Sequence, residues 1–186
     1  VMAVVRSLML ALFAVAGVKA ATAQQTDPEN TLLMDLEYGR VVIAMRPDLA
    51  PKHVARIKEL VRAGFYDGLT FHRVIPGFMA QGGSSDGEGR SGSGVNIPAE
   101  FSDAPHVRGT VSMARKPNDP DSADSQFFIV IGSAAPHLDG EYTVWGEVIE
   151  GLDAVLRLKK GSRANNGMVR DPDKILRMQV AADASD

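Results

Sequence analysis

The stretch that decides the fold spans residues 71–83 and reads FHRVIPGFMAQGG. Residues 69–75 are rich in β-branched and aromatic side chains, which indicates a β-strand. Pro76-Gly77 is a turn signal, and residues 78–81 continue as a second short strand. The stretch therefore predicts a hairpin of two short strands that lie side by side.

Side chains alternate between the two faces of a strand, so one face of the first strand is predicted to carry Phe71, Arg73 and Ile75. Beyond the turn, Phe78, Met79 and Gln81 return alongside. This spacing places Arg73 and Gln81 among apolar side chains, in a semi-apolar pocket with two strong hydrogen-bond donors. A surface arginine in an ion pair is the alternative, and the spacing alone leaves both interpretations open.

Around this hairpin, short strands and turn residues dominate the chain. Pro51 begins a helix with apolar residues at helical spacing, and Gly64 ends it. A second helix is expected over residues 150–160. The expected strands are residues 31–37, 40–45, 69–75, 78–81, 110–114, 126–131, 142–148 and 174–182. The fold class is therefore mainly β, a closed eight-stranded antiparallel β-barrel capped by two α-helices.

The composition excludes several classes of site. The 186 residues contain no cysteine, which rules out disulfides, thiolate nucleophiles and cysteine-ligated zinc. The four histidines lack the spacing of a zinc helix, so neither a metal nor a cofactor is expected. A net charge of −3 argues against a nucleic-acid binder. With 45% hydrophobic and 23% charged residues, the chain is an ordinary globular one.

Residues 1–23 have the pattern of a secretory signal peptide. Arg6 precedes an apolar run over residues 8–16, and Ala21-Thr22-Ala23 matches an A-x-A cleavage site. The run is shorter than the roughly 20 residues that span a bilayer, which disfavours a membrane anchor. We therefore expect a periplasmic or secreted protein without membrane contact after cleavage. Residues 24–29 would form a linker, residues 30–182 the folded domain and residues 183–186 a tail.

Three features of the sequence match the residue types of known functional sites but lack the neighbouring residues that such sites require. Residues 87–92 match G-x-G-x-x-G, but no helical pattern follows to receive a pyrophosphate. The aspartates of residues 119–124 suggest a calcium loop, yet Ala123 stands where a ligand is needed, which favours a solvated loop. Serine, histidine and aspartate are all present, but no G-x-S-x-G elbow supports a hydrolase.

Residues 71–83 resemble the signature segment of the cyclophilins, which are peptidyl-prolyl cis/trans isomerases. Residues 112–115 with 125–129 resemble the second family signature, and residues 138–140 with 144–148 resemble the closing part of the site. Order and spacing agree from about Asn30 to the C-terminus. The resemblance implies an isomerase that acts on proline-containing polypeptides. The signal peptide pattern adds the expectation that these polypeptides are exported and that the enzyme assists their folding.

The resemblance also implies the site. Arg73 takes the position of the catalytic arginine, and Gln81 that of the glutamine that holds substrate and arginine. The catalytic group is therefore expected to comprise Arg73, Gln81, Phe78 and Phe128. The substrate-binding group is expected to comprise Ile75, Met79, Ala114, Arg115, Gln126, His137, Leu138 and Tyr142. Among these, Ala114 and Arg115 lie where the bound peptide runs along the backbone, and Gln126 lies close to that groove.

Two positions depart from the eukaryotic members that bind cyclosporin. His137 stands in place of a tryptophan, so only weak cyclosporin binding is expected, and Tyr142 stands in place of a histidine. A binding module that uses the groove without catalysis is the competing hypothesis. Loss of the arginine or of the pocket phenylalanine would mark it, and the chain retains both Arg73 and Phe128. A monomer is expected.

Overall fold

The computed structural model describes residues 27–184, so the expected signal peptide and the first half of the linker, residues 24–26, lie outside the described residues. Each helix and strand is bounded as follows: β1 Thr31–Leu36, β2 Gly39–Met45, α1 Pro51–Arg62, β3 Arg73–Ile75, β4 Met79–Gly82, β5 Thr110–Met113, β6 Phe127–Val130, β7 Val144–Glu150, α2 Leu152–Arg157 and β8 Ile175–Val180. Short 3-10 turns at Pro28–Asn30, Pro136–Leu138, Arg163–Asn165 and Ala181–Asp183 complete the chain.

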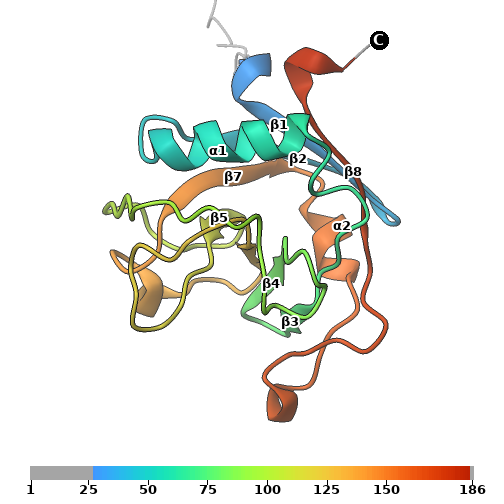
Figure 1. Cartoon of the computed structure of the whole chain (residues 1–186). Helices are drawn as coiled ribbons and strands as arrows, with labels where there is room; N and C mark the ends of the chain where they lie inside the picture. Colours follow the sequence, from blue (N-terminus) through green and yellow to red (C-terminus); the bar gives the residue numbers. More distant parts are fainter. Residues whose placement is uncertain (1–26, 185–186) are drawn as a thin grey trace, which may run out of the picture.

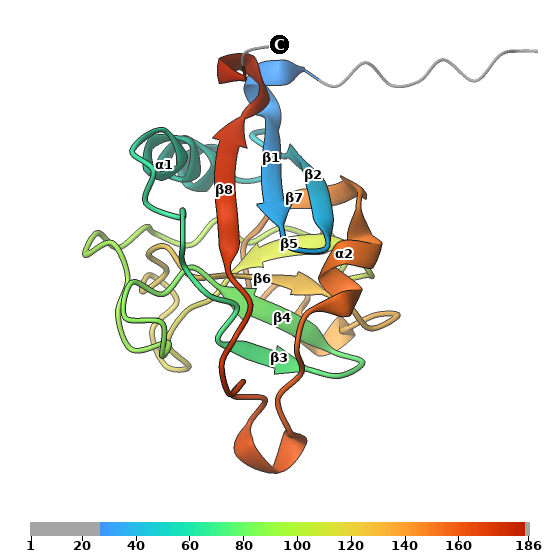
Figure 2. The same cartoon turned by 90° about the vertical axis from the view of Figure 1, so that its right-hand side faces the viewer.

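One antiparallel sheet holds all eight strands in the order β3-β4-β6-β5-β7-β2-β1-β8. Figure 2 shows β1, β2 and β8 upright, with β3, β4 and β6 crossing below them, so the sheet curls through a large angle. The edge strands β3 and β8 share no ladder, and the bridge between Thr70 and Lys174 joins the segments that precede them. The mainly β antiparallel fold is confirmed, with a curled half-barrel in place of full closure.

Helix α1 covers one side of the curled sheet and α2 the other (Figure 1, Figure 2). Helix α1 begins at Pro51 and ends near Gly64, as predicted, and it buries His53, Val54, Ile57, Leu60 and Val61. The four apolar side chains among them join a core that fills the inside of the half-barrel. No helix within residues 27–184 is long and apolar enough to cross a membrane.

Helix α2 spans less than the predicted 150–160, and it begins later because the β2–β7 ladder extends further. Glu150 pairs with Val42 and stays in β7, and Gly151 then adopts a left-handed φ of 75°. A Cβ on Gly151 would lie 2.0 Å from the carbonyl oxygen of Arg40, so only glycine fits between the strand and the helix. The helix therefore begins at Leu152.

Strand β3 is also shorter than the predicted 69–75, because the preceding residues bind Asp173 and Ile175, at the start of β8. The Phe71 amide donates to the carbonyl of Asp173, and the Ile175 amide donates to the carbonyl of Leu69. The prediction that Phe71 shares a face with Arg73 is therefore wrong. Phe71 is 1% exposed in the main core, edge to face with Phe127 at a centroid distance of 6.0 Å.

Candidate functional site

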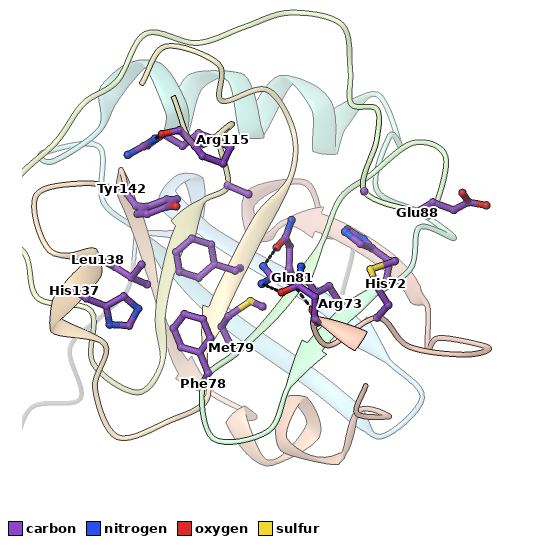
Figure 3. Close-up of a pocket in the computed structure, with 16 residues that line it drawn as sticks. His72, Arg73, Phe78, Met79, Gln81, Glu88, Arg115, His137, Leu138 and Tyr142 are labelled. Atoms are coloured by element: carbon purple, nitrogen blue, oxygen red, sulfur yellow. Dashed lines mark hydrogen bonds between the residues drawn. The ribbon is translucent and has the colours of Figure 1, made fainter. Parts of the chain in front are cut away.

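The β3–β4 hairpin sets the register of the site. Arg73 lies opposite Gln81, and Ile75 lies opposite Met79 across the Pro76-Gly77 turn. Residues directly opposite in an antiparallel pair have side chains on the same face, so the arginine and the glutamine meet. The Arg73 Nη1 donates to Gln81 Oε1 at 3.0 Å (Figure 3).

A distant loop fixes the rest of the guanidinium. Arg73 Nε donates to the carbonyl oxygen of Asn166 at 2.9 Å, and Nη2 donates to Asn166 Oδ1 at 2.8 Å. Three of the five guanidinium N–H groups are thus bound to protein acceptors, which leaves two for a ligand. Asn166 has a left-handed φ of 49°, a conformation that asparagine tolerates better than most residues.

Arg73 is not part of an ion pair with any carboxylate of residues 27–184. The surface ion-pair interpretation of the sequence is therefore wrong for the described chain. Partial burial lowers the pKa of Arg73 from its usual value, while the nearby Tyr142 raises it. The side chain remains cationic at any physiological pH, because arginine keeps its proton throughout that range.

Strand alternation separates the pocket from the core. Along β6, Phe127 and Ile129 enter the main core, whereas Phe128 and Val130 enter a second apolar cluster on the other face of the sheet. The second cluster contains Met79, Phe128, Val130, Ala135 and Leu138, with Ile75, Phe78, Ala114 and Tyr142 packed against it. The same strands thus build a core on one face and an apolar site on the other.

A cavity of about 590 Å³ lies over this second cluster. In Figure 3, Phe78, Met79, Leu138 and Tyr142 lie on one side of it, and Arg73 and Gln81 on the other. Ten of the twelve predicted site residues line it: Arg73, Phe78, Met79, Gln81, Ala114, Arg115, Phe128, His137, Leu138 and Tyr142. Ile75 lies in the cluster beneath it. Gln126 lines an adjoining cavity of about 360 Å³.

Comparisons with known proteins agree with this geometry. Residues 31–180 match the family model described as cyclophilin type peptidyl-prolyl cis-trans isomerase/CLD. The chain belongs to the cyclophilin family of peptidyl-prolyl cis-trans isomerases.

A probable peptidyl-prolyl cis-trans isomerase of Brucella suis is 53% identical over 174 residues, which cover 87% of this chain and 88% of the relative. Peptidyl-prolyl cis-trans isomerase B of Bacillus subtilis is 44% identical over 129 residues, covering 68% and 88%.

Two solved structures have the same fold. A cyclophilin from Hirschia baltica superposes with a TM-score of 0.75 at 31% identity, covering 86% of this chain and 77% of that chain. A cyclophilin-type isomerase from Cryptosporidium parvum, crystallised in the presence of the dipeptide Ala-Pro, superposes with a TM-score of 0.74 at 27% identity, covering 84% and 99%.

In this cyclophilin, the side chain of Arg115 binds the protein itself. Its Nε donates to the Glu141 carbonyl at 2.9 Å, and its Nη1 donates to the carbonyls of Lys116 and Pro117 at 3.0 and 2.9 Å. Its Nη2 lies 3.2 Å from Glu141 Oε2, and the guanidinium stacks 4.7 Å from the Tyr142 ring centroid. Arg115 thus connects two loops at the rim of the pocket, and a peptide in the groove would meet its backbone.

Gln126 holds the other side of the cyclophilin site. Gln81 Nε2 donates to Gln126 Oε1 at 3.0 Å, and Gln126 Nε2 donates to the carbonyls of Gly89 and Ser91 at 3.1 and 3.2 Å. The glycine-rich loop therefore supports a chain of hydrogen bonds that ends at Arg73. The G-x-G-x-x-G letters of that loop precede no helix, as predicted, since residues 87–96 consist of bends and irregular backbone.

The sequence did not indicate several residues that line the cavity: His72, Glu88, Gly89, Pro117, Asn166 and Met168. Asn166 is the most important because it holds Arg73 from 93 positions away. The Asn166-Gly167 pair is a turn signal, which indicates a loop but not its contact with β3. Within the described residues, no group of three histidine, aspartate or glutamate side chains could hold a metal ion.

Proposed function

We propose that this isomerase accelerates rotation about Xaa-Pro bonds in exported polypeptides and thereby assists their folding. The observation that carries the catalytic part is the fixed guanidinium of Arg73 beside an apolar pocket, with two N–H groups left for a ligand. The substrate class is an extended proline-containing segment of an unfolded chain, and the enzyme would act as a monomer.

The reaction requires only that one amide twists. Resonance between the amide nitrogen and its carbonyl produces a barrier of roughly 18–20 kcal/mol. As the bond twists, the prolyl nitrogen loses this resonance, and its lone pair can then accept a hydrogen bond. A guanidinium N–H of Arg73 aimed at that nitrogen would bind the twisted form better than either planar form, which lowers the barrier. No covalent bond breaks, so the mechanism requires no nucleophile.

The apolar side of the pocket would hold the prolyl ring while the preceding carbonyl rotates. Met79, Phe128 and Leu138 are 2%, 4% and 8% exposed, so the surface is firmly packed. The Phe128 ring meets Tyr142 edge to face at 5.7 Å, and Phe78 lies 5.4 Å from the His137 ring. Side chains that are fixed by packing keep a bound ring in one orientation relative to Arg73.

Export rests on residues 1–23, where Arg6, the apolar run and the A-x-A site follow the order of a signal peptide. The test is to express the full chain in a Gram-negative host and to fractionate the cells. A processed form in the periplasmic fraction is expected, and it should disappear when Leu12→Arg interrupts the apolar run. Unprocessed protein in the cytoplasm of both strains would refute export.

The folding role needs a second assay on the processed protein. An exported protein whose refolding is limited by a prolyl bond refolds in tens to hundreds of seconds without catalysis. The slow phase should shorten with isomerase concentration, and Arg73→Ala should abolish the effect. If the unaltered protein does not shorten the slow phase, the groove acts as a binding module and the catalytic proposal fails. If Arg73→Ala shortens it equally, the role assigned to Arg73 is wrong.

A further inference from the structure

Three side chains form a hydrogen-bonded chain behind the apolar pocket, which we call the pocket brace: Asp139, His106 and Ser112. His106 Nδ1 lies 2.9 Å from Asp139 Oδ1, and His106 Nε2 lies 3.1 Å from Ser112 Oγ. The His106 backbone amide also donates to Asp139 Oδ1 at 2.7 Å. His106 and Ser112 are 1% and 0% exposed.

The brace has the residue types of a hydrolase triad but cannot act as one. Ser112 Oγ is buried inside β5 and donates to the Thr143 carbonyl at 2.7 Å. No substrate carbonyl can reach a hydroxyl with no solvent exposure, so the serine cannot be a nucleophile. The brace needs another explanation, because buried polar groups are retained at a desolvation cost.

Each member of the brace is next to a wall of the pocket. The His106 ring stacks on Phe128 with a centroid distance of 6.0 Å and an interplanar angle of 18°. Asp139 follows Leu138 in the chain, and the Thr143 carbonyl follows Tyr142, and both of these neighbours line the cavity. The brace thus connects Phe128 of β6 with the segment that carries Leu138 and Tyr142.

The tautomer of His106 fixes the orientation of its ring. Burial lowers the pKa of His106, against the hydrogen bond and charge of Asp139, which raise it, while His137 lowers it. The ring is therefore neutral at pH 7, and the Asp139 carboxylate, an acceptor only, requires the proton on Nδ1. Nε2 is then an acceptor for the Ser112 hydroxyl, which it shares with the Thr143 carbonyl. Asp139 thus selects both the tautomer and the ring plane.

We propose that His106 is a positioning residue of the isomerase, whose ring, oriented by Asp139, holds Phe128 in the place where it meets the prolyl ring. Asp139 acts through His106 and touches no substrate. This inference concerns the geometry of the pocket and is independent of export.

The same motif occurs a second time and supplies the control. His53, 0% exposed in α1, places its Nδ1 2.7 Å from Glu100 Oε2, and its backbone amide donates to the same oxygen at 3.0 Å. Neither His53 nor Glu100 lines either of the two cavities at the site. Loss of the carboxylate at Glu100 therefore removes the same pair of hydrogen bonds away from the pocket.

The experiment compares Asp139→Ala, Asp139→Asn and Glu100→Ala in the full chain, by isomerisation of an Ala-Pro peptide and by thermal unfolding. Asp139 is exposed, so these variants should fold. Asp139→Ala should lower kcat/KM about tenfold, mainly through kcat, because the apolar surface remains but is misplaced relative to Arg73. Asp139→Asn keeps an acceptor oxygen and should retain at least a third of the activity. Glu100→Ala should lower the Tm but leave kcat/KM within twofold.

Nuclear magnetic resonance gives a readout that a purely structural role would not move. His106 should show the Nδ1–H tautomer in the unaltered protein, and Asp139→Ala should change both this tautomer and the ring signals of Phe128. Full activity of a folded Asp139→Ala variant would overturn the proposal. Equal activity losses in Asp139→Ala and Glu100→Ala would also overturn it, because the effect would then follow stability.

Discussion

Replacement of Arg73 by lysine tests whether catalysis depends on the orientation of the guanidinium as well as on its positive charge. The guanidinium is held by Gln81 and by both oxygens of Asn166, which leaves two N–H groups in a defined plane. A lysine ammonium has three rotatable donors on a flexible stem and cannot reproduce this planar arrangement. Arg73→Lys therefore keeps a positive charge in the pocket and loses its orientation.

The magnitude follows from the loss of one oriented, charge-assisted donor to a transition state. Removal of such a donor costs about 2.7–4 kcal/mol, or about 10²–10³ in kcat. The apolar pocket remains intact in the variant, so KM should change far less than kcat. We expect Arg73→Lys to lose nearly as much kcat/KM as Arg73→Ala, within about threefold of it.

The assay is the isomerisation rate of Ala-Pro peptides at equal enzyme concentration, with folding checked by circular dichroism. Arg40→Ala is the matched control, since Arg40 forms only a surface pair with Asp35 at 2.7 Å on the β1–β2 hairpin. It should retain full activity, because an exposed pair contributes about 0–1 kcal/mol to stability. More than half of the unaltered activity in Arg73→Lys would refute the geometric argument.

Four more outcomes are expected. Asn166→Gly keeps the left-handed backbone but removes the Oδ1 that accepts from Arg73, so kcat/KM should fall about tenfold without a matching loss of Tm. An unchanged rate would mean that the backbone carbonyl of residue 166 suffices to orient Arg73. Arg115→Lys should lower the free energy of unfolding in urea by about 1.5–3 kcal/mol, since hydrogen bonds of a charged group are lost, while isomerisation falls less than in Arg73→Lys. Burial lowers the pKa of His53, His72 and His106, so the unfolded chain binds more protons just below pH 6.5. Stability should therefore fall as the pH drops through that window, by up to about 1.4 kcal/mol per pH unit for each histidine, and His53→Gln should reduce the slope. His137→Trp should tighten cyclosporin binding in calorimetry, and equal affinities would show that this position does not limit it.

Local signals in the sequence predicted the elements whose hydrogen bonds are local. The β1–β2 hairpin, the start of α1 at Pro51 and the β3–β4 hairpin all agree with turn and capping residues within a few positions. The pairing of Arg73 with Gln81 follows from the hairpin register alone. The identities of the pocket residues came from the resemblance to the cyclophilins, because no periodicity brings Phe128 and Leu138 to Met79.

The errors share one physical cause, which is competition from distant partners. Residues 69–72 have strand propensity, but they bind the segment before β8 and leave the β3 ladder. Glu150 was predicted to begin a helix, but it pairs with Val42 and stays in β7. Propensity acts as a weak prior that tertiary pairing overrides, so such boundaries cannot be predicted from local patterns.

The loop of residues 161–167 orients Arg73 through Asn166, and it also covers the open edge of the sheet at β3. This explains why the barrel need not close. The Val74 amide donates to the Gly167 carbonyl at 2.8 Å, and the Gly161 amide donates to the Val74 carbonyl at 2.9 Å, so the loop satisfies the edge of β3. A Cβ on Gly167 would lie 2.4 Å from Ile75 Cγ1, so the loop packs this closely against β3 because residue 167 is glycine. A ladder from β8 at the same edge would displace Asn166 from Arg73. The unclosed edge is therefore the place where a segment without regular structure can orient the catalytic side chain.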